Sequence, residues 1–204
     1  MKKSLLLLSF CLIGLFTFAQ KTIIHCGKLI DTKNLKVLEK MTIVVEGKKI
    51  VGLENGYSKG NSSDQIIDLK SKTVMPGLID MHVHLESETN PNAYLDRFTK
   101  NPGDVAYQAM VFAKRNLMAG FTTVRDLGGS HVVISLRNAI NRGLVDGPRV
   151  FTAGVALGST GGHADDSNGL NETFKKDLGP EDGVVNGTRD AAKAVRQRYK
   201  EGSD

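Results

Sequence analysis

After Pro76-Gly77, the sequence alternates between short apolar segments and longer segments in which apolar residues recur at helical spacing. This change of spacing indicates strands that alternate with helices. Alternation of this kind predicts parallel strands joined by crossover helices, so the predicted fold class is α/β. The predicted strands are residues 78–85, 121–127 and 149–153, and a long polar loop covers about residues 155–186. The predicted helices are residues 103–119, 132–141 and 188–199, and Gly120 and Gly143 are the predicted stops of the first two. The apolar stripe predicted for the third helix consists of Ala191, Ala192, Val195 and Tyr199.

The segment before Pro76-Gly77 has a different pattern, made of short strand-like runs. Two of these runs flank Gly47-Lys48, which predicts a hairpin. The sequence therefore predicts a small all-β domain at residues 20–76, followed by a second domain at residues 77–204. The predicted strands of the first domain are residues 22–30, 41–46, 49–53, 66–69 and 73–75.

The first residues have the composition of an export signal. Lys2 and Lys3 precede an apolar run at residues 5–18, which ends at the small residue Ala19. We therefore predict a signal peptide at residues 1–19 and a mature protein in the periplasm or outside the cell. A membrane anchor is the alternative, but the apolar run is shorter than the ~20 residues that span a bilayer. No membrane association is expected after cleavage.

The charge excludes one class of partner. The chain has 27 basic residues, 22 acidic residues and no Trp. Loss of Lys2 and Lys3 with the signal peptide would leave 25 basic residues against 22 acidic ones. Because the basic residues form no continuous block, the sequence does not predict a nucleic-acid-binding surface.

The chain has two cysteines, Cys11 and Cys26. Cys11 would leave with the signal peptide, so the mature chain cannot form an internal disulfide. Cys26 lies in a strand-like run and is predicted to pack in the core.

A pair of histidines closes the first predicted strand of the second domain. Side chains alternate between faces along a strand, so Asp80, His82 and His84 are expected to share one face. Three adjacent polar side chains are costly to bury unless they share partners or a metal ion. His82 and His84 are therefore predicted to bind a divalent metal, with zinc as the expected ion. Two core histidines satisfied by hydrogen bonds are the alternative.

Four segments in order resemble one known family. The segment around the histidine pair, TVMPGLIDMHVHL, resembles the signature of the amidohydrolase superfamily, in which an H-x-H pair closes the first strand of a metal-bearing barrel. AGFTTVRDLGG and GPRVFTAG are similar to the second and third strands of that barrel. GGHADD is similar to a loop of the imidazolonepropionase-like or Xaa-Pro dipeptidase-like branch. The resemblance runs from about Ile23 to the C-terminus and covers the N-terminal half of such enzymes.

The resemblance implies a composite fold. Residues 20–76 would form part of a small β-sandwich, which the C-terminal end of such enzymes completes. Residues 77–204 would form the first βα units of a TIM-like (β/α)8 barrel. A full barrel needs ~250 residues, so the barrel is expected to be incomplete in this chain.

The resemblance also implies two metal ions in a full-length member of the family. A carboxylated lysine on the fourth strand would bridge them, further histidines would come from the fifth and sixth strands, and an aspartate on the eighth would handle the proton of the attacking water. These groups would lie beyond Asp204, so no catalytic residue is assigned within this chain. His163, in GGHADD, resembles a family position that shapes the substrate pocket and is predicted to bind substrate. An exposed loop histidine is the alternative.

Four further polar residues have expected roles. Arg125 and Asp126 end the second predicted strand of the barrel. They would either contact substrate or, in the favoured interpretation, form an internal ion pair that braces the barrel. His25 and His131 are expected to be structural or exposed.

The function implied for the full-length enzyme is metal-dependent hydrolysis of a carbon–nitrogen bond, that is, of an amide or peptide bond and not of an ester. The substrate would be a small molecule or a dipeptide, as for a dipeptidase or a cyclic amidase, and a homo-oligomer is compatible with this function. Two alternatives stay open. In the first, the chain would be an inactive truncated fragment with no catalysis of its own. In the second, the parent enzyme would be of the imidazolonepropionase or deaminase type.

Overall fold

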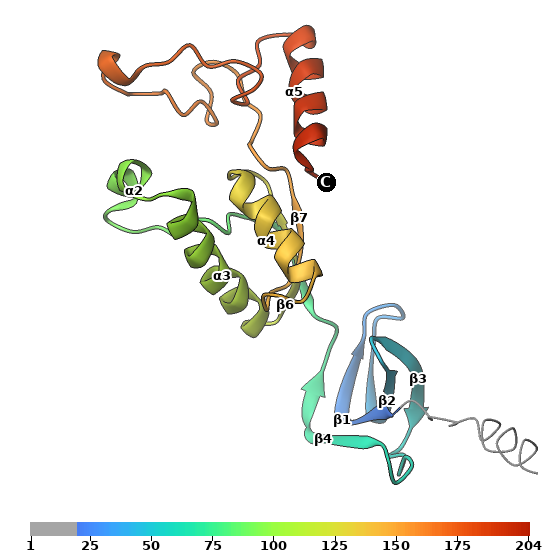
Figure 1. The fold of residues 1–204 in the computed structure, drawn as a ribbon. Helices are drawn as coiled ribbons and strands as arrows, with labels where there is room; N and C mark the ends of the chain where they lie inside the picture. Colours follow the sequence, from blue (N-terminus) through green and yellow to red (C-terminus); the bar gives the residue numbers. More distant parts are fainter. Residues whose placement is uncertain (1–19) are drawn as a thin grey trace, which may run out of the picture. The chain divides into compact units, whose positions relative to one another are not determined.

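The computed structural model describes residues 20–204. The chain divides into two compact units, a β unit that ends at Pro76 and an α/β unit that spans Gly77–Asp204 (Figure 1). The predicted signal peptide at residues 1–19 lies outside the described residues. Within residues 20–204, every helix is too short or too polar to cross a membrane.

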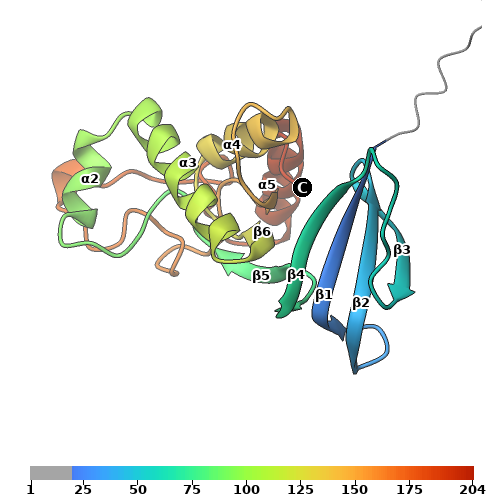
Figure 2. The ribbon, with the colours of Figure 1, turned by 90° about the horizontal axis from the view of Figure 1, so that it is seen from below.

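The β unit contains four strands: β1 (Lys21–Asp31), β2 (Lys36–Glu46), β3 (Lys49–Asn55) and β4 (Gln65–Val74). They form one mixed sheet in the order β3-β2-β1-β4 (Figure 2). β1 pairs antiparallel with β2 and parallel with β4. The predicted hairpin is confirmed, because Glu46 pairs with Lys49 and Gly47 takes the left-handed φ of 58° that suits a two-residue turn.

One prediction for the β unit is wrong. The two brief strands expected within residues 66–75 form the single strand β4. The register of β4 against β1 shifts between Cys26 and Lys28. At this bulge, Gly27 lies so close to the carbonyl of Lys70 that a Cβ atom would overlap with it. A glycine on β1 therefore allows one strand to continue where two were expected.

The core of the β unit is small. Cys26, Leu29, Met41 and Ile43 pack together, and each of them is 6% exposed or less. Cys26 is fully buried, which confirms its predicted place in the core. Burial also raises the pKa of its thiol.

The α/β unit contains a parallel sheet of three strands in the order β5-β6-β7. The strands are β5 (Leu78–Val83), β6 (Phe121–Asp126) and β7 (Arg149–Thr152). Helix α3 (Pro102–Met118) connects β5 to β6, α4 (His131–Asn141) connects β6 to β7, and α5 (Thr188–Glu201) follows the long loop. The predicted parallel strands with crossover helices are thus confirmed.

Two short elements of this unit are not predicted from the sequence. They are the helix α2 (Ala93–Thr99) and the 3-10 turn η1 (Glu172–Phe174). No residue of either is buried, so neither carries the apolar stripe from which a helix is recognised.

The long helices begin and end where the local sequence requires. Pro102 lies in the first turn of α3, and Asn101 and Asp104 form a capping box there. Gly120 and Gly143 take left-handed φ values of 99° and 71° just after α3 and α4. Both glycines were the predicted stops, since the left-handed conformation ends a helix at little cost only for glycine.

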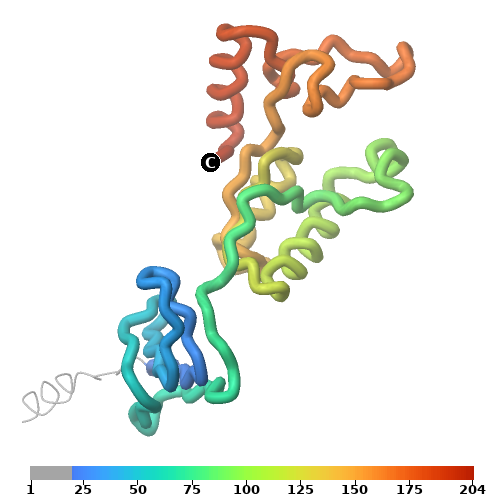
Figure 3. Tube along the Cα trace, turned by 180° about the vertical axis from the view of Figure 1, so that it is seen from behind, coloured from blue at the N-terminus to red at the C-terminus, as the bar shows by residue number. Residues whose placement is uncertain are grey.

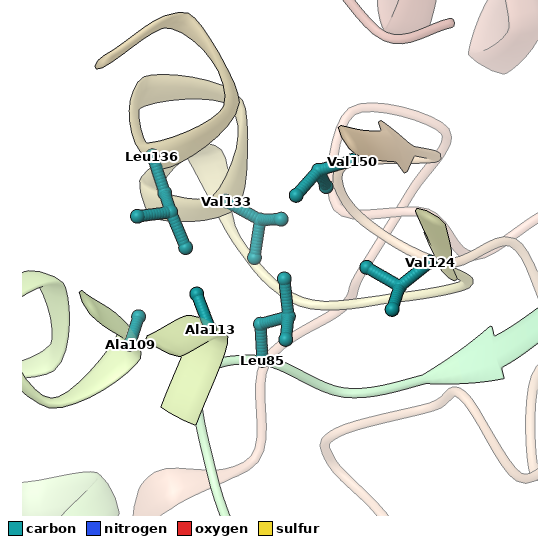
Figure 4. Close-up of a cluster of buried hydrophobic side chains, with 7 residues drawn as sticks. All are labelled: Leu85, Ala109, Ala113, Val124, Val133, Leu136 and Val150. Atoms are coloured by element: carbon teal, nitrogen blue, oxygen red, sulfur yellow. The ribbon is translucent and has the colours of Figure 1, made fainter. Parts of the chain in front are cut away.

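The core of the α/β unit lies between one face of the sheet and the helices α3 and α4 (Figure 4). The opposite face is open within the described part of the chain. On that face, Ile79, Met81 and Phe151 are 61%, 58% and 46% exposed, and they line a cavity of about 450 Å³. The buried cluster consists of Leu85, Ala109, Ala113, Val124, Val133, Leu136 and Val150.

The predicted long loop runs from the end of β7 out and back to α5 (Figure 3). A parallel β-bridge between Gly158 and Val184 joins the outgoing and returning segments of the loop. Arg198 of α5 donates hydrogen bonds to the carbonyl oxygens of Glu181, at 2.7 Å, and Val155, at 3.5 Å. Helix α5 therefore holds both ends of the loop.

The apolar stripe predicted for α5 is wrong in part. Val195 and Tyr199, which were expected to face the core, are 59% and 83% exposed. The buried positions are Ala194 and Arg198. The helix turns Arg198 inward because this side chain binds the loop carbonyls, and this leaves the apolar side chains outside.

Candidate metal centre

His82 and His84 lie together at the carboxyl end of β5. Their ring centroids are 5.3 Å apart, and the rings meet edge to face at 69°. Both side chains are exposed. β5 ends at Val83, earlier than the predicted end at Leu85, because the amide of Leu85 donates to the carboxylate of Asp126 at 2.8 Å. The two imidazoles thus stand just where regular pairing stops.

A backbone carbonyl fixes the protonation of His84. Its Nδ1 lies 2.7 Å from the carbonyl oxygen of Gly128. A carbonyl oxygen can only accept a hydrogen bond, so Nδ1 must carry the proton. In the neutral ring, Nε2 then keeps its lone pair for another partner. Histidines that bind metals are commonly oriented in this way by a carbonyl at the second ring nitrogen.

Asp126 holds the two backbone segments that meet at His84. It is fully buried, and it accepts hydrogen bonds from the amides of Leu85, at 2.8 Å, and Gly128, at 3.2 Å. These bonds fix the residue after His84 and the residue whose carbonyl orients its ring. Burial raises the pKa of the Asp126 carboxyl, although the two amides act in the opposite direction.

The expected ion pair between Arg125 and Asp126 is wrong. Neighbouring residues on a strand point to opposite faces. Asp126 is buried on the helix side, whereas Arg125 is exposed and lines the cavity on the open face. The carboxylate is satisfied by amides, and Arg125 has no acidic partner within residues 20–204.

Glu86 gives the site a second anchor that sequence reasoning missed. Its Oε1 accepts hydrogen bonds from the amide and the hydroxyl of Ser130, at 2.9 and 2.7 Å. The Ser130 hydroxyl in turn accepts from the amide of Val132 and so caps α4. Glu86 continues the series of polar side chains at every second residue from Asp80, and that was the signal available in the sequence.

Asp80 does not share a face with the histidines as simple alternation predicts. Asp80 pairs with Val124, and Val83 pairs with Asp126, so the register shifts between them. Val124 and Asp126 are both buried on the helix side, which places Asp80 and Val83 on that side as well. The Asp80 carboxylate instead accepts a hydrogen bond from the amide of His82 at 3.0 Å.

His163 is exposed in a turn of the long loop. The loop around it is organised by Asp165, whose carboxylate accepts hydrogen bonds from the amides of Gly161 and Ser167 and from the Ser167 hydroxyl. No group of three or more His, Cys, Asp or Glu residues among residues 20–204 could hold a metal ion. The structure therefore brings His82 and His84 together and adds neither His163 nor a third ligand to them.

The other two histidines are structural or exposed, as expected. His25 is buried in the β unit, where its Nε2 lies 2.7 Å from the carbonyl oxygen of Ser58. His131 is exposed at the start of α4, with its Nε2 3.4 Å from the carboxylate of Glu201.

The donor set at the end of β5 fits a divalent metal ion in part. It offers two adjacent imidazoles, one of which has its lone pair freed by a fixed tautomer. Catalytic zinc sites ordinarily use three protein ligands. A complete site would therefore need further donors besides His82 and His84.

Solved structures of known enzymes share this fold. A Xaa-Pro dipeptidase with methionine bound in its active site matches with a TM-score of 0.85 and 44% sequence identity, over 91% of this chain and 46% of its own. A prolidase complexed with N-methylphosphonate-L-proline matches with a TM-score of 0.74 and 33% identity, over 90% of this chain and 45% of its own. The chain thus spans less than half the length of these enzymes.

Sequence comparison identifies the same group of proteins. Ochratoxinase from Aspergillus niger is 31% identical over 150 residues, which make up 72% of this chain and 31% of that enzyme. The family model described as the amidohydrolase family matches residues 73–203. That range contains the histidine pair, its anchors and the long loop. The chain therefore belongs to the amidohydrolase family, whose members hydrolyse carbon–nitrogen bonds, and it is related to prolidases and ochratoxinase.

Proposed function

We propose that the full-length protein hydrolyses the amide bond of a dipeptide, with the help of a divalent metal ion that His82 and His84 hold in part. The single observation that carries this proposal is the pair of imidazoles at the end of β5, with the His84 ring fixed by Gly128. Zinc is the proposed ion. When bound, such an ion lowers the pKa of a water ligand toward ~7 and polarises the carbonyl that is attacked.

The residues of this chain have defined tasks in that proposal. His82 and His84 supply two of the donors. Asp126 and the carbonyl of Gly128 keep the His84 ring in one orientation and one tautomer. Glu86 ties the segment after His84 to the start of α4. No residue is proposed here to move the proton of the attacking water.

The proposed setting of the site is a TIM-like (β/α)8 barrel, of which β5, β6 and β7 would be the first three strands. The parallel order β5-β6-β7 and the match to the dipeptidase structure support it. In such barrels, active sites lie at the carboxyl ends of the strands, where His82 and His84 lie. The β unit would belong to a sandwich with further strands.

The named ligands of the relatives support a substrate built from amino acids. One relative has methionine in its active site, and the other is complexed with a phosphonate derivative of proline. Dipeptides of the Xaa-Pro type are therefore the first substrates to test. We also propose that His163 lines the substrate pocket. The protein is further proposed to be exported by a signal peptide that is cleaved after Ala19.

A second candidate is that the 204-residue chain alone has no activity. The open face of its sheet exposes Ile79, Met81 and Phe151, and its described residues offer no third metal ligand beside the histidine pair. Activity is therefore proposed for the full-length protein, and the isolated chain is expected to be inactive.

The test combines metal content with a substrate panel. Full-length protein should contain zinc and hydrolyse Xaa-Pro dipeptides, and chelation should abolish this activity. Replacement of both His82 and His84 by Ala should remove most of the zinc, whereas His131→Ala, a matched change of an exposed histidine, should leave it in place. Unchanged zinc in the double variant would end the metal assignment. Turnover of imidazolonepropionate or adenine, without turnover of any dipeptide, would favour a ring-opening enzyme or a deaminase instead.

A further inference from the structure

Two segments that lie far apart in the sequence meet through aromatic side chains. Tyr94 and Phe98 of α2 lie with their ring centroids 5.3 Å apart at an angle of 64°. Phe98 also faces Phe174 of η1, with centroids 6.3 Å apart at 54°. These three residues are called the aromatic cluster below.

The aromatic cluster is not a core. Tyr94, Phe98 and Phe174 are 62%, 56% and 61% exposed, and α2 has no buried residue. Three large rings in contact would ordinarily gain from being covered, because aromatic side chains bury 150–250 Å² each. The cluster therefore presents an apolar surface that is assembled but uncovered in the described part of the chain.

One ion pair joins α2 to the long loop, and further polar contacts fix the end of α2 against α3. Arg97 of α2 forms an ion pair with Asp166 of the long loop at 2.8 Å. Lys100, just after α2, binds Asp96 at 2.8 Å and Gln108 of α3 at 2.6 Å. These contacts flank the rings and leave their faces free. Arg97, Asp96 and Lys100 are therefore paired with one another or with the loop, and the three rings themselves carry no charge.

The cluster stands at the same end of the sheet as the histidine pair. Residues 85–92 lead from the carboxyl end of β5 to α2, and the long loop with η1 leaves the carboxyl end of β7 (Figure 1). The connection after His84 is anchored twice, by Glu86 on Ser130 and by Glu88 on Arg115 at 2.6 Å. In parallel α/β sheets, ligands bind at this end, between the loops that follow neighbouring strands.

On the basis of the proposed function, we propose that the aromatic cluster forms one wall of the substrate pocket. It takes a large apolar side chain on the amino-terminal residue of a dipeptide. Its two segments follow β5 and β7 at the end of the sheet where His82 and His84 lie, among the loops from which pockets in such folds are built. Its uncharged rings favour an aromatic or branched apolar side chain over a charged one. The cluster thus sets specificity and takes no part in the chemical step.

The test compares full-length wild-type protein with Phe98→Ala and Phe174→Ala on two substrates, Phe-Pro and Gly-Pro. Loss of one ring should lower kcat/KM for Phe-Pro about 10-fold or more, mainly through KM, since pocket contacts of this kind discriminate by about 10–200-fold. The value for Gly-Pro should change less than about 2-fold, and Phe98→Leu should restore most of the loss. Tyr199→Ala is the matched control, because Tyr199 is an aromatic residue of α5 with 83% exposure and no ring contact with the cluster.

Direct binding keeps this test separate from the test of the proposed function. Calorimetry with non-hydrolysable phosphonate analogues of Phe-Pro and Gly-Pro should show the same discrimination without any turnover. Equal losses for both substrates, or no preference for the Phe-Pro analogue in the wild type, would overturn the role of the cluster while dipeptide hydrolysis stands. Binding of the analogues without hydrolysis of any dipeptide would instead end the proposed function. Dissociation of an oligomer on Phe98→Ala, with unchanged analogue binding, would make the cluster a contact between copies of the chain and also overturn its assignment to substrate.

Discussion

The two faces of the β5-β6-β7 sheet are built from similar residues but have different surroundings. On one face, Val124 and Val150 are buried beneath α3 and α4. On the other, Ile79, Met81 and Phe151 remain largely exposed. β5 and β7 each place apolar side chains on both faces, so apolarity alone does not show which face is covered. The difference arises because both crossover helices of the described chain lie on one side.

The covered and open faces of the sheet make different contributions to the stability of the described structure. The covered face supplies the packing energy of the α/β unit. The open face exposes large apolar side chains to water, and a patch of this composition favours association with another surface. A strand such as β5 carries both faces, and His82 and His84 lie at its end. The geometry of the candidate site therefore depends on a sheet that is packed on one side only.

The largest expected effect is a difference in the free energy of unfolding between mutations on the two faces. Leu85→Ala should lower the free energy of unfolding of the 204-residue chain by about 2–5 kcal/mol, because Leu85 is 1% exposed within the core cluster. Met81→Ala should cost less than about 1 kcal/mol, since Met81 is 58% exposed and loses little burial. Urea unfolding of the soluble chain at low concentration, where aggregation is slow, measures both by circular dichroism. Equal losses would show that the open face is covered in solution.

The next prediction concerns the open face itself. The isolated 204-residue chain should aggregate and bind a hydrophobic dye, and it should lack dipeptidase activity. Replacement of Ile79 and Met81 by Ser should reduce dye binding and raise the soluble fraction, whereas Val51→Ser in the β unit, a matched change of a residue with 52% exposure, should leave the dye binding of the α/β unit unchanged. A soluble monomer with metal-dependent activity would contradict the prediction.

The sequence predicts those parts of the fold that depend on local signals. α3 and α4 begin and end as expected because Pro102, Gly120 and Gly143 act on their own backbone. The histidine pair is also predictable, because alternate positions on a strand point the same way. These features need no knowledge of distant partners.

The features that could not be predicted depend on contacts between distant residues. Glu86 meets Ser130, and Asp126 meets the amide of Leu85, across more than forty residues of sequence. The register shift after Asp80 depends on how β5 fits against β6. Helix α2 lacks a buried face, so no periodicity marks it. The anchors of the candidate site belong to this second group, although its two imidazoles belong to the first.

A smaller effect should follow from a change to the covered side of the site. Asp126→Asn keeps the size of the side chain but leaves one acceptor oxygen in place of two. The Leu85 and Gly128 amides donate to different oxygens of Asp126, so one of these hydrogen bonds should be lost. The His84 ring should lose its fixed orientation, and the zinc affinity of the full-length protein should fall about 10- to 100-fold, as for other residues that orient metal ligands. Competition with a chromophoric chelator measures this affinity. Asp165→Asn, a change of another buried carboxylate that accepts amide hydrogen bonds, is the control and should leave zinc affinity within about 3-fold.

The smallest effect concerns pH and the long loop, which belongs to neither face of the sheet. The Ser167 hydroxyl, together with the amides of Gly161 and Ser167, lowers the pKa of the Asp165 carboxyl. A carboxyl whose pKa is lowered by folding contributes stability above its unfolded pKa of ~3.9, and this contribution is lost as pH falls through the lower, folded pKa. Cleavage of residues 155–186 by an acid-stable protease should therefore accelerate below about pH 4 in the wild type, beyond the change in the protease itself on an unfolded substrate. In Asp165→Asn the cleavage should already be faster at neutral pH and should lack this acid-dependent rise. If both chains showed the same pH profile, the loop would owe its order to the Gly158–Val184 bridge and the Arg198 contacts instead of to the Asp165 carboxylate.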